Sequence, residues 1–142
     1  MIRPAVIDDS KKIAELSGVL GYPVTQEAVE QRLGRLLNQP SQLVLVAELA
    51  PGLVVGWLHA AEQELLESGQ RCEILGLVVE ASRRRTGAGK KLVEAAERWA
   101  RARGLDQMTV RSNVARTESH PFYERLGYAR NKTQHAYGKR LS

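Results

Sequence analysis

The stretch that decides the fold is Leu77-Val78-Val79-Glu80-Ala81-Ser82-Arg83-Arg84-Arg85-Thr86-Gly87-Ala88-Gly89-Lys90-Lys91. An apolar strand leads into a basic turn that contains two glycines, and the turn opens a helix. Backbone N–H groups in such a turn point at one place, where the helix dipole and the flanking Arg and Lys side chains add positive charge. The stretch therefore predicts a binding site for a pyrophosphate group.

The composition is typical of one globular domain, with 43% hydrophobic and 26% charged residues, and we expect a single domain over residues 1–142. No apolar run approaches the roughly 20 residues that a bilayer span requires, and residues 1–7 do not resemble a secretory leader. We therefore expect a cytoplasmic protein that does not bind a membrane. The single cysteine, Cys72, lies in an apolar pattern and is expected to be buried rather than nucleophilic.

The net charge of +5 is unevenly distributed. Residues 1–70 carry 5 Lys/Arg and 9 Asp/Glu, whereas residues 71–142 carry 16 Lys/Arg and 7 Asp/Glu. The basic second half favours a polyanionic partner, either a nucleic acid or a phosphorylated small molecule. Aromatic residues make up only 5% of the chain and no nucleic-acid-binding motif occurs, so we expect no nucleic-acid partner.

The apolar spacing predicts the order of the elements. We expect strands at residues 2–7, 43–47, 53–61, 73–79, 108–111, 128–131 and 134–140, and a polar loop at residues 62–70. Helices are predicted after the N-cap candidates Asp8 to Ser10, after Thr25, from Ala88 to Arg103, and over residues 117–126. Adjacent strands followed by one strand–helix–strand crossover predict an α/β (α+β) sandwich, with a mixed, mostly antiparallel sheet, one local parallel pair and helices on both faces.

Three blocks occur in order along the second half of the chain. The first, Arg84 to Gly89, has the form Arg-x-x-Gly-x-Gly; the second is Asn113, after the next predicted strand; the third runs from Phe122 to Tyr128. With this order and spacing, the chain resembles the GNAT superfamily of acetyl-CoA-dependent N-acetyltransferases over about its whole length. The resemblance implies an enzyme that transfers an acetyl group from acetyl-CoA to a primary amine, by direct attack in a ternary complex.

The resemblance also implies how acetyl-CoA binds. In this family a bulge splays the strand at residues 77–79 from the following strand, and main-chain groups of Leu77 and Val79 would pair with the pantetheine arm. The N–H near Val78 or Val79 would polarise the thioester carbonyl. The expected cofactor-binding residues are Leu77, Val78, Val79, Arg84, Arg85, Thr86, Gly87, Ala88, Gly89, Lys90 and Asn113. For Asn113, a turn-forming role is the competing interpretation.

Glu73 is the candidate general base, because it matches the position of the glutamate base in some family members. Strand alternation places it on the face of Leu75, Leu77 and Val79, where apolar neighbours would raise its pKa. An ordinary strand-edge glutamate that pairs with Arg71 is an equal alternative.

Tyr123 matches the tyrosine that, in this family, protonates the departing CoA sulfur, and it is the candidate general acid. Its alternative role is to pack its ring within the short helix. His120 is expected to be a surface or capping residue rather than a catalytic one. His59 and His135 lack the spacing of metal ligands, so no metal is expected.

The acceptor is the least determined part of the prediction. By resemblance, its groove is bordered by the first two helices, their connection and the strand loops, which makes Tyr22, Trp57, His59 and the loop at residues 62–70 candidates for substrate binding. The acidic first half favours a cationic amine, carried by a small molecule or a peptide. A homodimer is a family-level expectation. The alternatives to an enzyme are a noncatalytic acyl-CoA-binding regulatory module and, less favoured, a basic nucleic-acid-binding domain.

Overall fold

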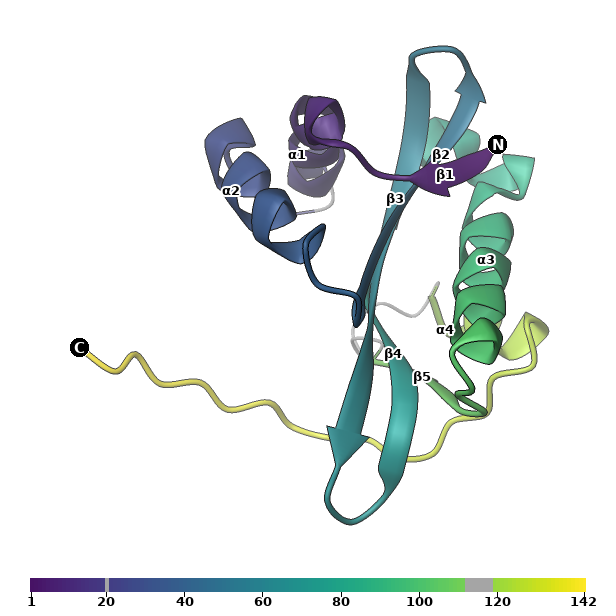
Figure 1. Ribbon diagram of the computed structural model, residues 1–142. Helices are drawn as coiled ribbons and strands as arrows, with labels where there is room; N and C mark the ends of the chain where they lie inside the picture. Colours follow the sequence, from purple (N-terminus) through teal and green to yellow (C-terminus); the bar gives the residue numbers. More distant parts are fainter. Residues whose placement is uncertain (20, 112–118) are drawn as a thin grey trace. The chain divides into compact units, whose positions relative to one another are not determined.

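The structure is a computed structural model that describes residues 1–19, 21–111 and 119–142 (Figure 1). The described chain divides into two compact units, Met1–Val110 and Arg111–Ser142. The first unit contains the whole sheet and three of the helices, and the second contains a short helix and an extended segment. Most of the predicted site lies in the first unit.

A five-stranded sheet in the order β1-β2-β3-β4-β5 forms the centre of the first unit. The strands are β1 (Ile2–Pro4), β2 (Gln42–Ala50), β3 (Leu53–Leu65), β4 (Gly69–Val79) and β5 (Met108–Val110). Neighbouring strands run antiparallel except β4 and β5, which are parallel. This confirms the predicted mixed sheet with one local parallel pair.

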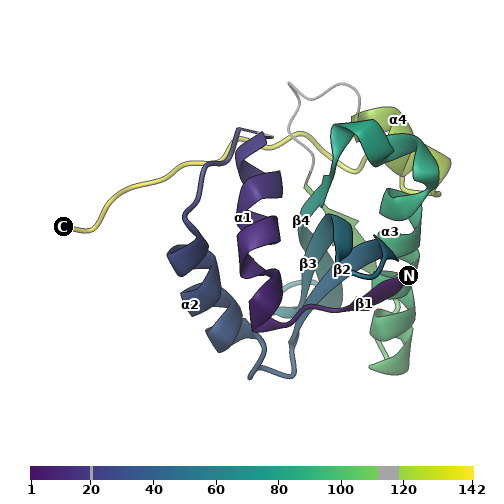
Figure 2. The ribbon, with the colours of Figure 1, turned by 90° about the horizontal axis from the view of Figure 1, so that it is seen from above.

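Helices cover both faces of this sheet, as predicted. Helices α1 (Ser10–Val19) and α2 (Gln26–Leu36) lie on one face and α3 (Ala88–Ala102) on the other, as Figures 1 and 2 show from two directions. The 3-10 turn η1 (Ile7–Asp9) precedes α1, and η2 (Ala81–Thr86) precedes α3. The predicted cap of α2 is confirmed, because Thr25 Oγ1 accepts a hydrogen bond from the Ala28 N–H at 3.1 Å.

Two apolar layers hold these elements together. On the α3 face, Leu58 of β3 and both Leu92 and Val93 of α3 are fully buried. On the α1/α2 face, the core consists of Ala5, Ile13, Leu16, Val29, Leu33, Val44, Val46, Val54 and Val78. Burial of each Val, Leu or Ile side chain contributes about 1.5–3 kcal/mol. Cys72 is fully buried, as predicted.

The polar loop predicted at residues 62–70 is wrong, because β3 continues to Leu65 and β4 already begins at Gly69. The strand pairing runs without interruption from Ala61↔Glu73 to Leu65↔Gly69. Figure 1 shows the end of this hairpin extending past α1, α2 and α3, so polar side chains are compatible with strand there. The backbone ladder, not an apolar face, therefore holds this part of the hairpin.

The second unit contains α4 (Ser119–Arg125), which corresponds to the helix predicted at residues 117–126. Residues 117 and 118 of that prediction lie outside the described residues. The strands predicted at residues 128–131 and 134–140 are wrong, since neither segment is a strand in the structure. Nearly every side chain after Gly127 is exposed, so the segment has no apolar face to bury and no paired backbone to fix it as a strand.

Candidate active site

The turn between β4 and α3 leaves the start of α3 open. Gly87 is the N-cap of α3 and has φ +81°, a left-handed conformation that glycine adopts without strain. No side chain caps this helix. The Lys91 N–H donates a backbone hydrogen bond to the Gly87 carbonyl at 3.0 Å. The three preceding amides, from Ala88 to Lys90, have no carbonyl one turn earlier in the helix. The start of a helix without a side-chain cap is the kind of position where the sequence predicts an anion site.

The basic side chains of this turn differ in their contacts. Arg83 Nε lies 3.8 Å from the Glu80 carboxylate, and the Arg83 carbonyl accepts a hydrogen bond from Thr86 Oγ1 at 2.6 Å. Arg84 and Lys90 are exposed, and no ion pair of theirs is recorded within the described part of the chain. Compared with Arg83, the motif residue Arg84 is therefore better placed to bind an anionic ligand.

Strand β4 has a partner on both sides only along part of its length. The parallel register with β5 comprises Cys72↔Met108, Glu73↔Thr109 and Ile74↔Val110. From Gly76 to Val79, the described residues provide a partner on the β3 side alone. The Glu80 N–H donates to the Val55 carbonyl of β3 at 2.8 Å, so strand alternation turns the backbone groups of Leu77 and Val79 to the open side.

A bulge precedes this open segment. Ile74 pairs with Ala60 and Gly76 pairs with His59, so Leu75 is an extra residue in β4. The predicted shared face of Glu73 with Leu75, Leu77 and Val79 is therefore wrong. Leu75 is the bulge itself, and the residues after it exchange faces, which places Glu73 on the same face as Gly76 and Val78.

Glu73 is buried on the α1/α2 face, with 3% of its surface exposed. Its Oε1 accepts hydrogen bonds from Arg71 Nη2 and from Thr109 Oγ1, both at 3.2 Å. The pairing with Arg71, predicted as the alternative to a base, is thus present. The Arg71 ion pair and the Thr109 hydrogen bond thus hold the Glu73 carboxyl in place beside the bulge.

Two of the substrate-binding candidates lie on this same face, on β3. His59 Nε2 is 2.7 Å from Gln42 Oε1, and burial lowers the pKa of His59, which favours the neutral ring. Trp57 packs against the core beneath α1 and α2. Its Nε1 is buried and has no hydrogen-bond acceptor among the described residues, a cost of about 1–3 kcal/mol. Tyr22 is 55% exposed in the connection between α1 and α2.

The remaining candidates lie elsewhere. Tyr123 belongs to α4 in the second unit, where its ring contacts Phe122 edge-on at 5.1 Å and Tyr128 at 6.0 Å between centroids. His120 is half-buried in the same helix. Asn113 lies outside the described residues. The ring packing predicted as the alternative role of Tyr123 is therefore observed, within its own unit.

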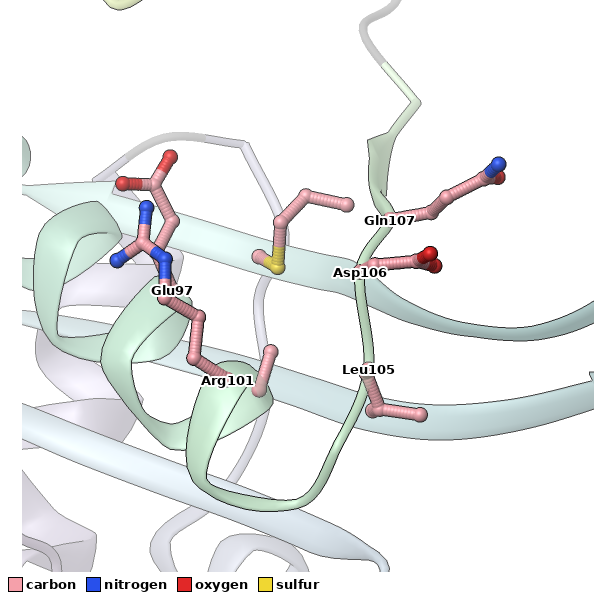
Figure 3. Close-up of a pocket in the computed structure, with 7 residues that line it drawn as sticks. Glu97, Arg101, Leu105, Asp106 and Gln107 are labelled. Atoms are coloured by element: carbon pink, nitrogen blue, oxygen red, sulfur yellow. The ribbon is translucent and has the colours of Figure 1, made fainter.

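Sequence reasoning missed a depression of about 330 Å³ at the other end of α3 (Figure 3). Its lining residues are Glu97, Ala100, Arg101, Leu105, Asp106, Gln107 and Met108. None of the predicted site residues lines it, and no motif marked it in the sequence. In the described ranges, no His, Cys, Asp and Glu side chains gather into a group that could hold a metal, and no helix there is long and apolar enough to cross a membrane.

The comparisons with known proteins agree with this geometry. The sequence model described as "Acetyltransferase (GNAT) family" matches residues 11–128. The chain belongs to the GNAT family of acetyltransferases. This confirms the family resemblance that the three blocks predicted.

A curated relative of this GNAT chain is "Acetyl transferase GW6a" of Oryza sativa subsp. japonica, which is 34% identical over 119 residues. The match covers 72% of this chain and 27% of that protein, so the chain spans only about a quarter of the length of the relative.

Solved structures share the fold over nearly the whole chain. A transcriptional regulator from Bacillus halodurans C-125 has a TM-score of 0.88 at 21% identity, and the match covers 98% of this chain and 99% of that one. An aminoglycoside antibiotic 6'-N-acetyltransferase from Acinetobacter haemolyticus has a TM-score of 0.85 at 20% identity, covering 100% and 99%. An aminoglycoside N-acetyltransferase in complex with CoA has a TM-score of 0.87 at 21% identity, covering 99% and 95%.

Proposed function

We propose that this chain transfers an acetyl group from acetyl-CoA to a primary amine carried by a small molecule or a peptide. One observation carries the proposal: the uncapped start of α3 follows, after the turn η2, the segment of β4 whose outer edge has no partner among the described residues. An anion site beside an open strand edge fits a ligand with a pyrophosphate at one end and amide groups along its arm.

The pyrophosphate of acetyl-CoA would bind the amides that follow Gly87, with added charge from Arg84 and Lys90. Arg85 and Thr86 belong to the same turn and would contribute their backbone, and Asn113 is the proposed contact beyond β5. The pantetheine amides would pair with Leu77 and Val79. Because the backbone of Val78 faces β3, the N–H of Val79 is the better placed donor to the thioester carbonyl.

Transfer requires a neutral amine. The acceptor, whose ammonium group has a pKa near 10 if it resembles lysine, loses a proton to Glu73, directly or through water. Its nitrogen attacks the thioester carbon, the C–N bond forms, and the C–S bond breaks. The departing thiolate takes a proton from Tyr123, and the second proton lost by the attacking nitrogen restores the Tyr123 phenol. The products are an amide and free CoA, and one proton remains on Glu73 until it passes to water.

The test combines binding and turnover. Acetyl-CoA at about 100 times its dissociation constant should stabilise the protein by about 2.7 kcal/mol, seen as a thermal shift. A panel of amines should then release free thiol. Stabilisation without thiol release from any amine would favour the noncatalytic acyl-CoA-binding module, and no stabilisation would remove the proposal.

A matched pair of variants tests the phosphate site itself. Gly87→Leu should abolish the acetyl-CoA shift, because a side chain would stand where the amides must approach an oxygen. Gly104→Leu is the control, since Gly104 lies just beyond the other end of α3 with φ +79° and imposes the same backbone strain far from the turn. Arg84→Gln, which leaves the backbone intact, should weaken the shift without destabilising the free protein.

A further inference from the structure

Trp57 of β3 lies directly against Gly76 of β4. A Cβ atom at Gly76 would stand 2.8 Å from both Cζ3 and Cη2 of the Trp57 ring, closer than side-chain carbons approach one another. The two residues are diagonal neighbours on the α1/α2 face, because Trp57 pairs with Val78 and His59 pairs with Gly76. The absence of a side chain at Gly76 is therefore what allows the indole to lie in this position.

The indole has one buried end and one end at the bulge. Its Nε1 is buried, and the side chain packs against the core formed with α1 and α2. The opposite end of the ring system, Cζ3 and Cη2, rests on Gly76, the residue that follows the bulge at Leu75. Trp57 as a whole is only partly buried, so part of the indole remains open to solvent on this face.

The surroundings of this ring favour a cation. Glu73 lies on the same face, on the other side of the bulge from Gly76, and its Oε1 accepts hydrogen bonds from Arg71 and Thr109. A primary ammonium group is attracted both by a carboxylate and by the face of an indole. Burial lowers the pKa of His59, the other titratable group of this face on β3, which favours its neutral form, and the nearby Arg71 cation is already paired with Glu73.

We propose that Trp57 and Gly76 form a specificity-determining pair for the acceptor. The indole holds the ammonium group of the acceptor beside Glu73 before deprotonation. Gly76 is required because any larger residue would displace the indole from this position. This inference rests on the proposed function, since it concerns the amine of that reaction. It adds a residue, Gly76, to which the sequence assigned no role.

The buried Nε1 of Trp57 allows binding of the ammonium group to be distinguished from a purely stabilising role. A tryptophan retained only for stability should make use of its N–H, whereas here the N–H has no acceptor in the described part of the chain. Trp57→Phe removes that N–H together with Cζ3 and Cη2. It should therefore leave the thermal midpoint near the wild-type value or above it, while the KM for the amine rises.

A double-mutant cycle tests the pair by kinetics. Gly76→Ala should raise the KM for the best amine of the panel by about 2–30-fold, the range of a cation–π interaction, with little change in the acetyl-CoA thermal shift. In a Trp57→Leu background, which lacks the clashing ring atoms, the same change should raise the KM less than about twofold. Equal effects of Gly76→Ala in both backgrounds would overturn the proposal.

A binding experiment keeps the proposal testable even without turnover. The chain has two tryptophans, so Trp99→Phe leaves Trp57 as the only indole reporter. Tetramethylammonium cannot be acetylated and cannot donate a hydrogen bond, and tert-butanol is its uncharged counterpart. With CoA bound, tetramethylammonium should change the Trp57 fluorescence at concentrations where tert-butanol does not, and Gly76→Ala should weaken this response.

The outcomes distinguish the two proposals. If the wild-type protein releases thiol but its Trp57 fluorescence responds equally to both probes, the pair is not an ammonium site and the acetyltransferase proposal stands. If tetramethylammonium alone gives the response while no amine yields thiol, the ammonium site stands and the catalytic proposal fails.

Discussion

Cys72 and Glu73 are neighbours in β4 and lie on opposite faces of the sheet, yet both are buried. On the α3 face, burial, reinforced by the nearby carboxylates of Glu62 and Glu73, raises the pKa of the Cys72 thiol to about 11, so the thiol stays neutral. On the α1/α2 face, Arg71 and Thr109 both donate hydrogen bonds to Oε1 of the buried Glu73. One step along the strand thus separates an apolar environment from one built for a charged group.

The rest of each face continues this difference. The largest fully buried side chains on the α3 face, such as Leu58 and Leu92, are aliphatic. The α1/α2 face instead contains a histidine with a lowered pKa and a tryptophan whose buried N–H has no recorded acceptor. Such local costs are typical of functional sites. We therefore expect substitutions on the α3 face to change stability and those near Glu73 to change rate.

The largest expected effect is on catalysis at Glu73. Glu73→Gln keeps an oxygen that accepts from Arg71 and Thr109 but cannot take a proton from the amine. We expect kcat to fall by about 10²–10⁴-fold, the contribution of a general base, while the acetyl-CoA thermal shift is kept. The measurement is steady-state thiol release.

The matched control is Cys72→Ala, the adjacent residue on the other face. It should lower stability but leave kcat per folded molecule unchanged. A Glu73→Gln variant with wild-type kcat would show that the base is elsewhere, and the two faces would then not differ in the way described here.

The next effect is on stability at the α3 face. Leu92 is fully buried against β3, and Leu92→Ala would lose transfer free energy and leave a cavity. We expect a loss of about 2–5 kcal/mol in the free energy of unfolding, measured by urea denaturation, with the KM for the amine unchanged. A loss below about 1 kcal/mol would mean that this face is not close-packed.

A smaller effect concerns pH and the start of α1. Burial would raise the pKa of the Asp9 carboxyl, but hydrogen bonds from Arg3, at 2.9 Å, and from the Val6 N–H outweigh it, so the pKa lies below its ordinary value. A carboxyl with a lowered folded-state pKa contributes stability above its unfolded pKa and loses it as pH falls through the folded pKa.

We therefore expect the free energy of unfolding to decrease below about pH 4, by about 1.5–3 kcal/mol from this group, the range of hydrogen bonds to a charged partner. Asp9→Asn should be less stable near pH 6 and should lose less on acidification. Parallel pH profiles for the two proteins would contradict the assignment to Asp9.

The sequence predicted the elements that depend on local chemistry. The strand–turn–helix at residues 77–91 determines its own geometry, and both Thr25 and Gly104 mark helix ends by the rules of capping. The order of strands then leaves few sheet topologies open. For these reasons the mixed sheet and the parallel pair followed from the sequence, whereas the open edge after residue 76 was implied by the family resemblance.

What failed depends on contacts between distant residues. The bulge at Leu75 is visible only in the register with His59 and Ala60, and it reverses the faces of Leu77 and Val79. The sequence around Gly76 likewise does not indicate that the Trp57 ring packs against this residue. Similarly, the polar segment at residues 62–70 is part of the β3–β4 hairpin because its backbone pairs across the two strands. The side chains of this segment do not indicate that pairing.

The smallest expected effect is at the start of α2, and it concerns the contrast between two helix N-termini. The Thr25 hydroxyl caps the start of α2 by accepting a backbone hydrogen bond, whereas the N-cap of α3 is a glycine and provides no side-chain cap. Thr25→Ala should lower the free energy of unfolding by about 0.5–2 kcal/mol, measured by urea denaturation, and Thr25→Ser should restore most of it. Neither change should alter the acetyl-CoA shift, because the proposed anion site lies at the start of α3. A Thr25→Ala protein with wild-type stability would mean that an uncapped helix start has no cost in this fold, and the open start of α3 would then no longer point to a ligand.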